Sequence, residues 1–344
     1  MIDVAILGST GVVGQRFVSL LSKHPFFKIR EVFASENKKG RNYVEVVDWV
    51  LENEIPEEII NLKIKSIDEG VLSKVIFSAL PKEESFEIED KLSKEGYFVF
   101  SNSSSHRYDK FVPILVPEVN IEHIDSVKKQ NRSGFIITNP NCTTTGIVLS
   151  LKPVLDNFGI KKVLVVSMQA ISGAGIKGLS SLKILGNLIP FIENEEEKIE
   201  IETRKILGKF SEEGFIPNNF DLEARCNRVP IRDGHTIVMF VETEKRVEIK
   251  ELIEVLENFE GLPQKLYLPL APKKPIKVFK NNDRPQPILD VNYDNGMAIS
   301  VGRIKESSFF SFTITSLVHN TIRGAAGGSI LNAEVAFKLG YLRI

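Results

Sequence analysis

The cysteine at position 142 lies where a predicted strand gives way to a predicted helix. Residues 135–138 are apolar and β-branched, which is typical of a strand, and Asn139-Pro140-Asn141 interrupts it. From residue 143 onward, apolar residues recur at helical spacing. Free backbone N–H groups at a helix start stabilise a thiolate and can hold an oxyanion. The pattern presents Cys142 either as a nucleophile or as a small residue that fills a tight turn.

A glycine-rich loop near the start of the chain predicts a nucleotide site. The run ILGSTGVVGQRF places Gly8, Gly11 and Gly14 in the pattern GxxGxxG, between a predicted strand and a predicted helix. Glycine allows the backbone to approach a pyrophosphate, and the helix start supplies donors and positive potential. The alternative is a glycine turn in an α/β fold that binds no cofactor.

The end of the second predicted strand bears on the choice of cofactor. In NAD-specific folds this strand usually ends in an acidic residue that holds the ribose 2′-hydroxyl. Here Ser35 stands near that place, and Lys38 follows with two further basic residues at positions 39 and 41, which suits a 2′-phosphate. We therefore expect NADP (NADPH) rather than NAD. Glu36 argues against this choice, and the cations can equally be surface residues without a ligand.

A dinucleotide and a nucleophilic cysteine together indicate one reaction class. The thiolate attacks a carbonyl carbon, and hydride passes between the thiohemiacetal carbon and the nicotinamide, with an acyl thioester on the oxidised side. Such an enzyme interconverts aldehydes and activated acids, and it needs an acid/base group. The five histidines stand at positions 24, 106, 123, 235 and 319, and their local patterns do not select one of them.

Composition argues against several other classes of protein. The 344 residues are 42% hydrophobic and 26% charged, with a formal net charge of −1, which is typical of a globular chain with room for two domains and not of a nucleic-acid or membrane-surface binder. Two cysteines without a CxxC pair favour neither a disulfide framework nor a zinc site, so we expect no metal. We expect a cytoplasmic protein, because no apolar run reaches transmembrane length and the chain starts with a predicted strand rather than a signal peptide.

The order of predicted elements gives the fold class. Strands and helices alternate over residues 1–140, which indicates a parallel sheet. After residue 150 the strands are longer and suggest antiparallel pairing. The charged run 193–209 is predicted to be a helix with most of its charges on a solvated face. Residues 321–342 form a predicted helix rich in small residues, which we expect to pack closely.

Several segments, in matching order along nearly the whole chain, carry a resemblance to a known family. They are GSTGVVGQ, SNSSSHRYDKFVPILVPEVN, NPNCTTTG, QAISGAGIKG, EEEKIEIETRKIL, RCNRVPIRDGH and HNTIRGAAGG. Together they resemble the aspartate-β-semialdehyde dehydrogenase family, in its archaeal and fungal branch. The glycine loop alone is not specific, whereas the ordered set is.

The resemblance implies a role for each matching position. The implied catalytic residues are Cys142 as nucleophile, His235 as general acid/base, Gln169 orienting the acyl intermediate and Asn141 supporting the oxyanion. The implied substrate contacts are Arg228 for the α-carboxylate, Arg107 and Lys198 for phosphate and Glu195 for the amino group. The implied cofactor contacts are Gly8, Ser9, Thr10, Gly11, Val12 and Val13 in the loop, Ser35 at the 2′-phosphate, and Ser172, Gly173 and Asn320 near the nicotinamide; Lys38 joins Ser35 from its position alone.

The resemblance also implies a reaction and an architecture. The reaction is the NADPH-dependent reductive dephosphorylation of L-aspartyl-4-phosphate to L-aspartate-4-semialdehyde, which serves lysine, methionine and threonine biosynthesis. We expect an α/β protein with an N-terminal Rossmann-like parallel sheet and a second α+β domain of mixed sheet. Residues 1–140 with 321–344 are the predicted NADP-binding domain, and 141–320 the predicted catalytic and dimerisation domain of a homodimer or homotetramer.

Other readings compete with this one. A malonyl-CoA reductase shares the scaffold, but malonyl-CoA has no amino group and no phosphate to displace, whereas the EEEK acid–base pair is retained here. N-acetyl-glutamyl-phosphate reductase shares the chemistry with a poorer motif match. A non-catalytic NADP-binding redox sensor would not need the full set of cations. The segment 207–224 is longer than in common bacterial members, and it is expected to cover the site or to serve a subunit contact.

Overall fold

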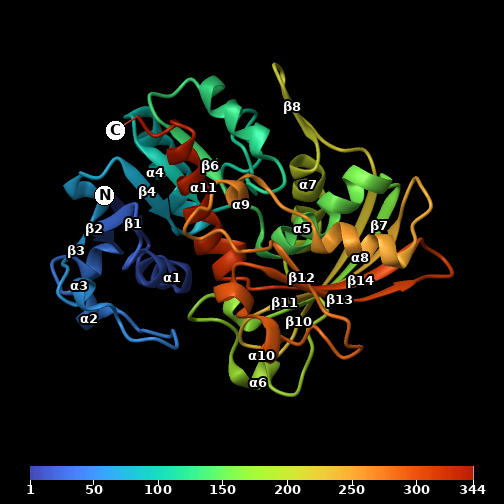
Figure 1. The fold of residues 1–344 in the computed structure, drawn as a ribbon. Coiled ribbons are helices and arrows are strands. Elements are labelled where there is room, and N and C mark those ends of the chain that lie inside the picture. Colours follow the sequence, from blue (N-terminus) through green and yellow to red (C-terminus); the bar gives the residue numbers. More distant parts are fainter. Residues whose placement is uncertain (344) are drawn as a thin grey trace.

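Two β-sheets form the framework of the chain. The structure is a computed structural model that describes residues 1–343. Six parallel strands make the first sheet, in the order β3-β2-β1-β4-β5-β6 (Figure 1). They are β1 (Ile2–Leu7), β2 (Phe27–Phe33), β3 (Ile64–Lys65), β4 (Val75–Ser78), β5 (Phe98–Ser101) and β6 (Phe135–Thr138). The expected Rossmann-like parallel sheet is thereby confirmed.

Helices cover both faces of this sheet, which explains why residues 4–7 of β1 and 75–77 of β4 are consecutive buried apolar residues. The elements of this half are α1 (Val12–Leu21), α2 (Tyr43–Val46), α3 (Glu57–Ile60), α4 (Lys82–Lys94) and the 3₁₀ helices η1 (Glu36–Lys38), η2 (Ile67–Glu69) and η3 (Ile121–Lys129). Phe17 of α1 packs on Phe77 of β4 with ring centroids 5.1 Å apart. Ile330 and Ala333 of the C-terminal helix α11 (Gly327–Lys338) lie in the same core.

The strand order also creates a place for a ligand. The first connections run from β1 to β2 and β3 on one side, and the later strands β4, β5 and β6 lie on the other side of β1. Loops that leave β1 and β4 therefore diverge at the carboxyl edge of the sheet. In open parallel sheets, ligands bind in the crevice at this point.

The second sheet is mixed, as the sequence predicts. Its order is β10-β7-β11-β14-β13-β12, with β10 parallel to β7, β12 parallel to β13, and the other neighbours antiparallel. Its strands are β7 (Lys162–Gln169), β10 (Asp221–Arg228), β11 (His235–Glu242), β12 (Ile276–Val278), β13 (Ile299–Glu306) and β14 (Phe312–Val318). The short strands β3 and β12, the edge strand β10 and the helix α8 (Ile249–Glu257) have no counterpart among the elements predicted from the sequence.

Helices cover one face of the second sheet. The buried residues Val165 of β7 and Met239 of β11 share a core with α5 (Cys142–Phe158) and α8, whose ribbons lie on one side of the sheet in Figure 1. The remaining elements are α6 (Ser181–Ile184), α7 (Glu195–Ile206), α9 (Leu262–Lys265), α10 (Pro287–Asp290), the 3₁₀ helices η4 (Ile171–Ala174) and η5 (Tyr293–Gly296) and the π-helical turn η6 (Ile322–Ala326). On the opposite face, alternate side chains of β7 and β11 stay half-exposed.

Helix α7 closes the free edge of the second sheet. Glu196 accepts a hydrogen bond from the backbone N–H of Cys226 at 2.9 Å, and Glu200 accepts one from Ala224 at 3.2 Å. Both N–H groups belong to the edge strand β10, whose outer backbone groups would otherwise lack partners. The acidic residues on this side of α7 thus fix the helix to the sheet.

The long segment after α7 forms a hairpin of β8 (Lys209–Ser211) and β9 (Gly214–Ile216), which projects from the body of the molecule (Figure 1). His123 of η3 holds its base through a 3.4 Å contact with the carbonyl oxygen of Gly208. None of residues 207–224 lines the cavity that contains Cys142. Within this chain the segment therefore contributes nothing to the lining of that cavity, and a subunit contact stays a prediction.

The C-terminal segment is interrupted rather than one continuous helix. The π-helical turn η6 precedes α11, and Gly324 lies so close to α5 that a Cβ atom there would approach the Cβ of Cys142 to 2.8 Å. The small residues of this segment therefore allow the close packing that the sequence predicts. Over residues 1–343, none of the helices is both long enough and apolar enough to cross a membrane.

Candidate active site

A thiol and an imidazole from two different elements meet at the junction of the sheets. Cys142 is the first residue of α5, and His235 is the first residue of β11. The Sγ of Cys142 lies 3.1 Å from the Nε2 of His235. Asn141 caps α5, since its side-chain oxygen accepts hydrogen bonds from the N–H groups of Thr143 and Thr144 at 2.9 and 3.3 Å. This arrangement is one that nucleophilic catalysis by a thiol requires.

The surroundings of the two groups shift both pKa values toward the neutral forms. Burial raises the pKa of the Cys142 thiol to about 12, with the Glu195 carboxylate adding to the effect, because a thiolate there would lose its hydration. Burial, followed by the Arg228 and His319 charges, lowers the pKa of His235 to about 3. The Nδ1 of His235 accepts a hydrogen bond from the N–H of Ala170 at 3.0 Å, so the neutral ring carries its proton on Nε2, facing Sγ.

An arginine and a glutamine stand beside this pair at the ends of two parallel strands. Arg228 ends β10 and Gln169 ends β7, and the strand register pairs them directly. The Nη1 of Arg228 donates at 2.9 Å to the carbonyl oxygen of Ala170, the residue whose N–H orients His235. The Nε2 of Gln169 donates to the Oγ of Ser167 at 3.2 Å. Both side chains are buried.

A second cation reaches the site from the loop after β5. The Nη1 of Arg107 donates to Glu202 at 2.9 Å, and its Nη2 donates to the carbonyl oxygen of Asn102 at 3.0 Å. Arg107, Asn102 and Cys142 line one cavity of about 620 Å³. The second oxygen of Glu202 accepts the backbone N–H of Asn141 at 2.6 Å. The sequence reasoning did not identify Glu202, and it placed most charges of this helix on a solvated face, yet Glu202 is fully buried.

The structure places the other two residues expected from α7 differently. Glu195 is buried and accepts a hydrogen bond from the Nδ2 of Asn141 at 2.8 Å, so it belongs to the network around the nucleophile. One Nδ2 hydrogen of Asn141 is thereby committed to Glu195, which limits what that amide can offer an oxyanion. Lys198 lies one turn along on α7 and is half-exposed. Its ammonium makes no ion pair with any carboxylate of residues 1–343, and the residue does not line the Cys142 cavity.

The glycine loop after β1 has the geometry of a phosphate-binding turn. Gly8 has a φ of +74°, and a Cβ there would meet the carbonyl oxygen of Ala79 at 2.6 Å. A Cβ on Gly14 would meet the Gly8 carbonyl oxygen at 2.1 Å, whereas one on Gly11, which lines the neighbouring cavity, would make only an ordinary contact of 3.6 Å with that oxygen. Two of the three glycines thus allow the strand, loop and helix to pack, and the third lets a ligand approach. Ser9 is fully buried and its Oγ donates to the Phe33 carbonyl oxygen at 3.0 Å, so its side chain has a structural partner.

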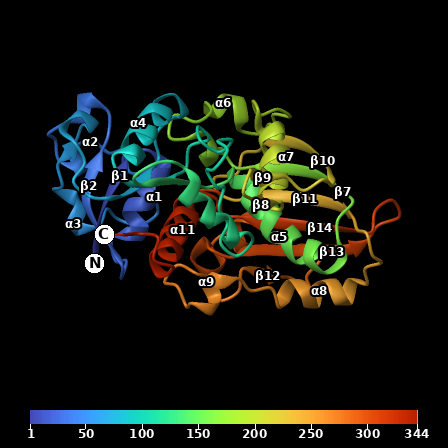
Figure 2. The same ribbon diagram turned by 90° about the horizontal axis from the view of Figure 1, so that it is seen from above.

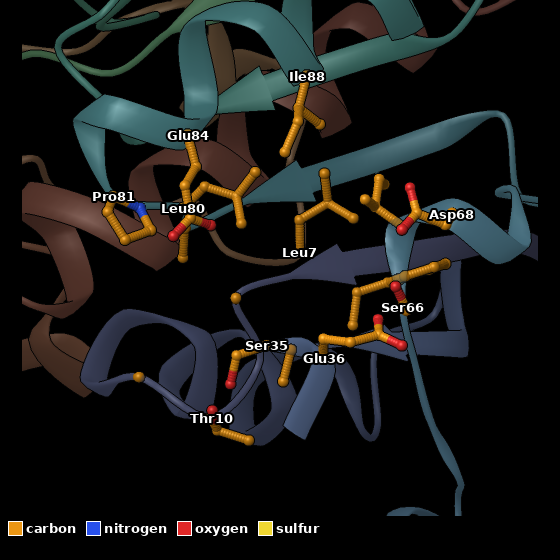
Figure 3. Close-up of a pocket in the computed structure, with 16 residues that line it drawn as sticks. Leu7, Thr10, Ser35, Glu36, Ser66, Asp68, Leu80, Pro81, Glu84 and Ile88 are labelled. Carbon is orange, nitrogen blue, oxygen red and sulfur yellow. The ribbon is translucent and has the colours of Figure 1, made fainter. Parts of the chain in front are cut away.

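A cavity of about 430 Å³ opens between this loop and the ends of β2 and β4 (Figure 3). Ser35 and Glu36 line it together with Thr10. The Nζ of Lys38 donates to the Oγ1 of Thr10 at 3.0 Å, which puts a cation at its rim. The Glu36 carboxylate, which argues against NADP, lies 3.6 Å from the Nζ of Lys39 and is partly neutralised by it.

The cofactor cavity continues toward the thiol. Val12 and Val13 at the start of α1 line the 620 Å³ cavity together with Ser172, Gly173 and Asn320. The Nδ2 of Asn320 donates to the Oγ of Ser172 at 2.8 Å, and its Oδ1 accepts the N–H of Gly234 at 2.9 Å. The residues predicted near the nicotinamide therefore face the same space as Cys142. The two cavities together offer an extended path from the end of β2 to the nucleophile.

Comparison with known families identifies both halves of the chain. A model described as semialdehyde dehydrogenase, NAD binding domain, matches residues 3–127, and one described as semialdehyde dehydrogenase, dimerisation domain, matches residues 151–323. An aspartate-semialdehyde dehydrogenase from Methanothermobacter thermautotrophicus is 45% identical over 97% of this chain and 99% of its own length. The resemblance inferred from the sequence is confirmed.

Other relatives refine this picture. The crystal structure of aspartate semialdehyde dehydrogenase with NADP from Candida albicans superposes with a TM-score of 0.92, at 37% identity, and covers 99% of this chain and all of that one. A malonyl CoA reductase (NADP) from Metallosphaera sedula is 36% identical over 99% of this chain and 98% of its own length. The nearer likeness in sequence is therefore to the aspartate-semialdehyde dehydrogenase.

Proposed function

The chain belongs to the semialdehyde dehydrogenase family, and from this we propose that it is an NADP-dependent aspartate-semialdehyde dehydrogenase. It reduces L-aspartyl-4-phosphate to L-aspartate-4-semialdehyde, with release of phosphate, in the biosynthesis of lysine, methionine and threonine. One observation carries the proposal: Cys142, in contact with His235, lines a cavity that runs to a dinucleotide-binding loop. The buried Arg107 lines the same cavity, and the buried Arg228 lies behind its lining residue Gly173. An acyl phosphate with an α-carboxylate needs that combination of nucleophile and cations.

The first chemical step forms a thioester on Cys142. The Sγ atom attacks the acyl carbon, a C–S bond forms, the C–O bond to phosphate breaks, and the thiol proton leaves with the phosphate. The proton on Nε2 of His235 stabilises the thiolate as it develops. Arg107 and Lys198 are assigned to the phosphate, although Lys198 must reorient toward the cavity to reach it. Arg228 is assigned to the α-carboxylate, with which a guanidinium makes paired hydrogen bonds.

The second step reduces the thioester and releases the aldehyde. NADPH, when bound, supplies the hydride that reaches the acyl carbon. The Nε2–H of His235 then stabilises the developing oxyanion. As this oxyanion collapses to the aldehyde, the C–S bond breaks and the Sγ thiolate takes up a proton from water. Gln169 and Asn141 are assigned to the orientation of the acyl group and of the oxyanion, and Glu195 to the substrate amino group. His235 can serve both steps because its proton already faces Sγ.

The chain fits NADP at the observed loop and cavities. The backbone packs so closely at Gly8 and Gly14 that neither position has room for a Cβ, whereas Gly11 lines the cavity. Residues 8–13 would hold the pyrophosphate, while Ser172, Gly173 and Asn320 would hold the nicotinamide end beside Cys142. Ser35 and Lys38 would meet the 2′-phosphate. We assign NADP binding to a domain of residues 1–140 and 321–344, and catalysis and dimerisation to residues 141–320.

Lys38 is the residue whose removal should discriminate between NADPH and NADH. In Lys38→Ala, we expect the KM for NADPH to rise roughly tenfold, the equivalent of one charge-assisted hydrogen bond, while the KM for NADH changes less than about twofold. Initial rates with each cofactor measure the two values. Lys39→Ala is the matched control, because Lys39 pairs with Glu36 and Glu69 rather than with Thr10. Equal effects on the two cofactors would remove Lys38 from the 2′-phosphate site.

The uncovered face of the second sheet is the proposed dimer contact. Leu164, Val166, Val238 and Phe240 are adjacent in the strand register, half-exposed, and on the face opposite α5. Four neighbouring apolar side chains on one sheet face favour association with a second copy. The matching family model, described as a dimerisation domain, spans these strands. We therefore propose a homodimer, or a tetramer built from such dimers, that works in the reducing cytoplasm, where Cys142 stays a free thiol.

Val238→Lys should convert this assembly to monomers, because the ammonium would be buried against the partner's apolar face. The molar mass from light scattering should fall to about half or less of the wild-type value. Glu257→Lys adds a similar cation on the exposed side of α8 and should leave the mass unchanged. If Val238→Lys keeps the wild-type mass while remaining folded, the contact lies elsewhere.

The reaction itself is tested by following nicotinamide absorbance in the reverse direction. L-aspartate-4-semialdehyde, phosphate and NADP⁺ should yield NADPH, and omission of phosphate should stop the reaction. A parallel cell with NAD⁺ measures the cofactor preference. Turnover with malonyl-CoA and NADPH, in the absence of turnover with the semialdehyde, would identify the chain as a malonyl-CoA reductase instead. Cofactor binding without turnover on either substrate would favour a redox sensor.

A further inference from the structure

One face of α7 carries a row of charged residues that starts beside Asn141, next to the nucleophile, and continues into the protein. Glu195, Lys198, Glu202 and Lys205 are spaced by three, four and three residues, so they share a face of the helix. The first two are the substrate contacts proposed above. Glu202 and Lys205 continue the row inward, where both are buried, and no role has been given to either.

Glu202 joins the two halves of the reacting site. One of its oxygens accepts the Nη1 of Arg107 at 2.9 Å, and the other accepts the backbone N–H of Asn141 at 2.6 Å. Arg107 is the proposed phosphate cation, and Asn141 immediately precedes the nucleophile. A single carboxylate therefore spans the guanidinium and the start of α5. A buried carboxylate is stable there because a guanidinium and a backbone N–H replace its hydration.

Lys205 holds the main chain of the loop that carries Arg107. Its Nζ donates to the carbonyl oxygens of Arg107 at 2.6 Å and of Val112 at 3.0 Å. Glu202 thus fixes the side chain of Arg107, while Lys205, one turn along the same helix, fixes its backbone. The two side-chain bonds of Arg107, to Glu202 and to the carbonyl oxygen of Asn102, use two of its five N–H donors, so the tethered guanidinium keeps donors for a ligand.

We propose that Glu202 is a positioning residue that sets the distance and orientation between the phosphate-binding guanidinium of Arg107 and the thiol of Cys142. This inference rests on the proposed function, because it takes Arg107 as the phosphate cation. A displacement in which the thiol attacks and phosphate leaves depends on both groups holding the same acyl phosphate at once. Small errors in such placement cost large factors in rate.

Glutamine at position 202 should uncouple the two groups while keeping the volume of the side chain. Its amide oxygen can accept from either Arg107 or Asn141, and its NH₂ group then faces the donor that remains. The matched control is Glu200→Gln. Glu200 lies on the same helix and also accepts a backbone N–H, that of Ala224, but it contacts neither Arg107 nor Asn141.

Two measurements test the proposal. In Glu202→Gln, we expect kcat to fall roughly 10²-fold and the KM for phosphate to rise about tenfold, with the KM for NADP⁺ unchanged. Separately, inorganic phosphate should protect Cys142 from iodoacetamide, and its half-protecting concentration should rise about tenfold in Glu202→Gln and stay at the wild-type value in Glu200→Gln. The second measurement needs no turnover, so it tests the coupling even if the proposed reaction fails.

Other results of these two measurements would contradict the proposal. If phosphate does not protect the wild-type thiol, or if Glu202→Gln matches Glu200→Gln in both measurements, the proposal is overturned. A lower kcat would also overturn it if the KM for phosphate and the half-protecting phosphate concentration both stay at the wild-type values, since that result indicates general damage to the fold. Where circular dichroism shows Glu202→Gln unfolded, Glu202→Asp replaces it: its shorter carboxylate keeps the charge but reaches only one donor, and the same shifts are expected.

Discussion

Cys142→Ala should lose at least about 10⁴-fold in the rate of phosphate-dependent NADPH formation, because no other group can form the acyl thioester. The thiol is the only one in the cavity, lies at the start of α5 and faces Nε2 of His235. The KM for NADP⁺ should change little, since the loop at residues 8–13 is untouched. Absorbance of NADPH with purified wild type and variant measures both quantities.

The second cysteine provides the control for this prediction. Cys226 is buried in the core between β10 and α5 and does not line the cavity. Cys226→Ala should keep kcat within about twofold, with a stability loss of about 1 kcal/mol from the lost packing. The nucleophile would be misassigned if Cys142→Ala retained turnover, and above all if Cys226→Ala lost it.

The sequence predicted most of the fold because its signals are local. The buried strands of the parallel sheet are continuous apolar runs, and the glycine loop identifies the first βα turn. The missed strand β3 has two residues, too few for any pattern. β10 was readable, since Asp221-Leu222-Glu223-Ala224-Arg225-Cys226 alternates strictly between polar and apolar residues. The helix α8, with its apolar stripe in IKELIEVLE, carried a signal of the same quality.

The site was harder to predict because its geometry is set by long-range packing. Cys142 and His235 are 93 residues apart, and their contact depends on the register of β7 with β11 and on how α5 packs over that sheet. Spacing alone left all five histidines open, and the choice of His235 came from the family resemblance. Glu202 was missed for a related reason: a charged helical run is usually solvated, and only the tertiary contact with Arg107 shows that this carboxylate is buried.

His235→Gln should lower kcat by about 10²- to 10⁴-fold while leaving the KM for phosphate within a few-fold. The reason lies in the Nε2–H, which faces Sγ and stabilises negative charge in both steps, and we expect a glutamine amide not to hold a donor at that place. The position of this hydrogen follows from the N–H of Ala170, which occupies Nδ1 and also opposes protonation of the ring. His123→Gln is the matched control, since His123 is a buried histidine that contacts Asn120 and Gly208 outside the cavity. A wild-type kcat in His235→Gln would remove the ring from the chemistry.

The pH dependence of thiol alkylation distinguishes two protonation states of Cys142 and His235. In one state both groups are neutral, and in the other a thiolate faces an imidazolium. The pKa of Cys142 is raised and that of His235 lowered, so at pH 7 both groups are neutral and only a small fraction of thiolate exists. That fraction grows about tenfold per pH unit below the thiol pKa, so the rate with iodoacetamide should rise steadily from pH 6 to pH 9. His235→Gln should react more slowly at each pH, because the thiolate loses the Nε2 donor. A flat profile from pH 5 to pH 8 in the wild type would instead require a thiolate–imidazolium pair, which the Ala170 contact disfavours.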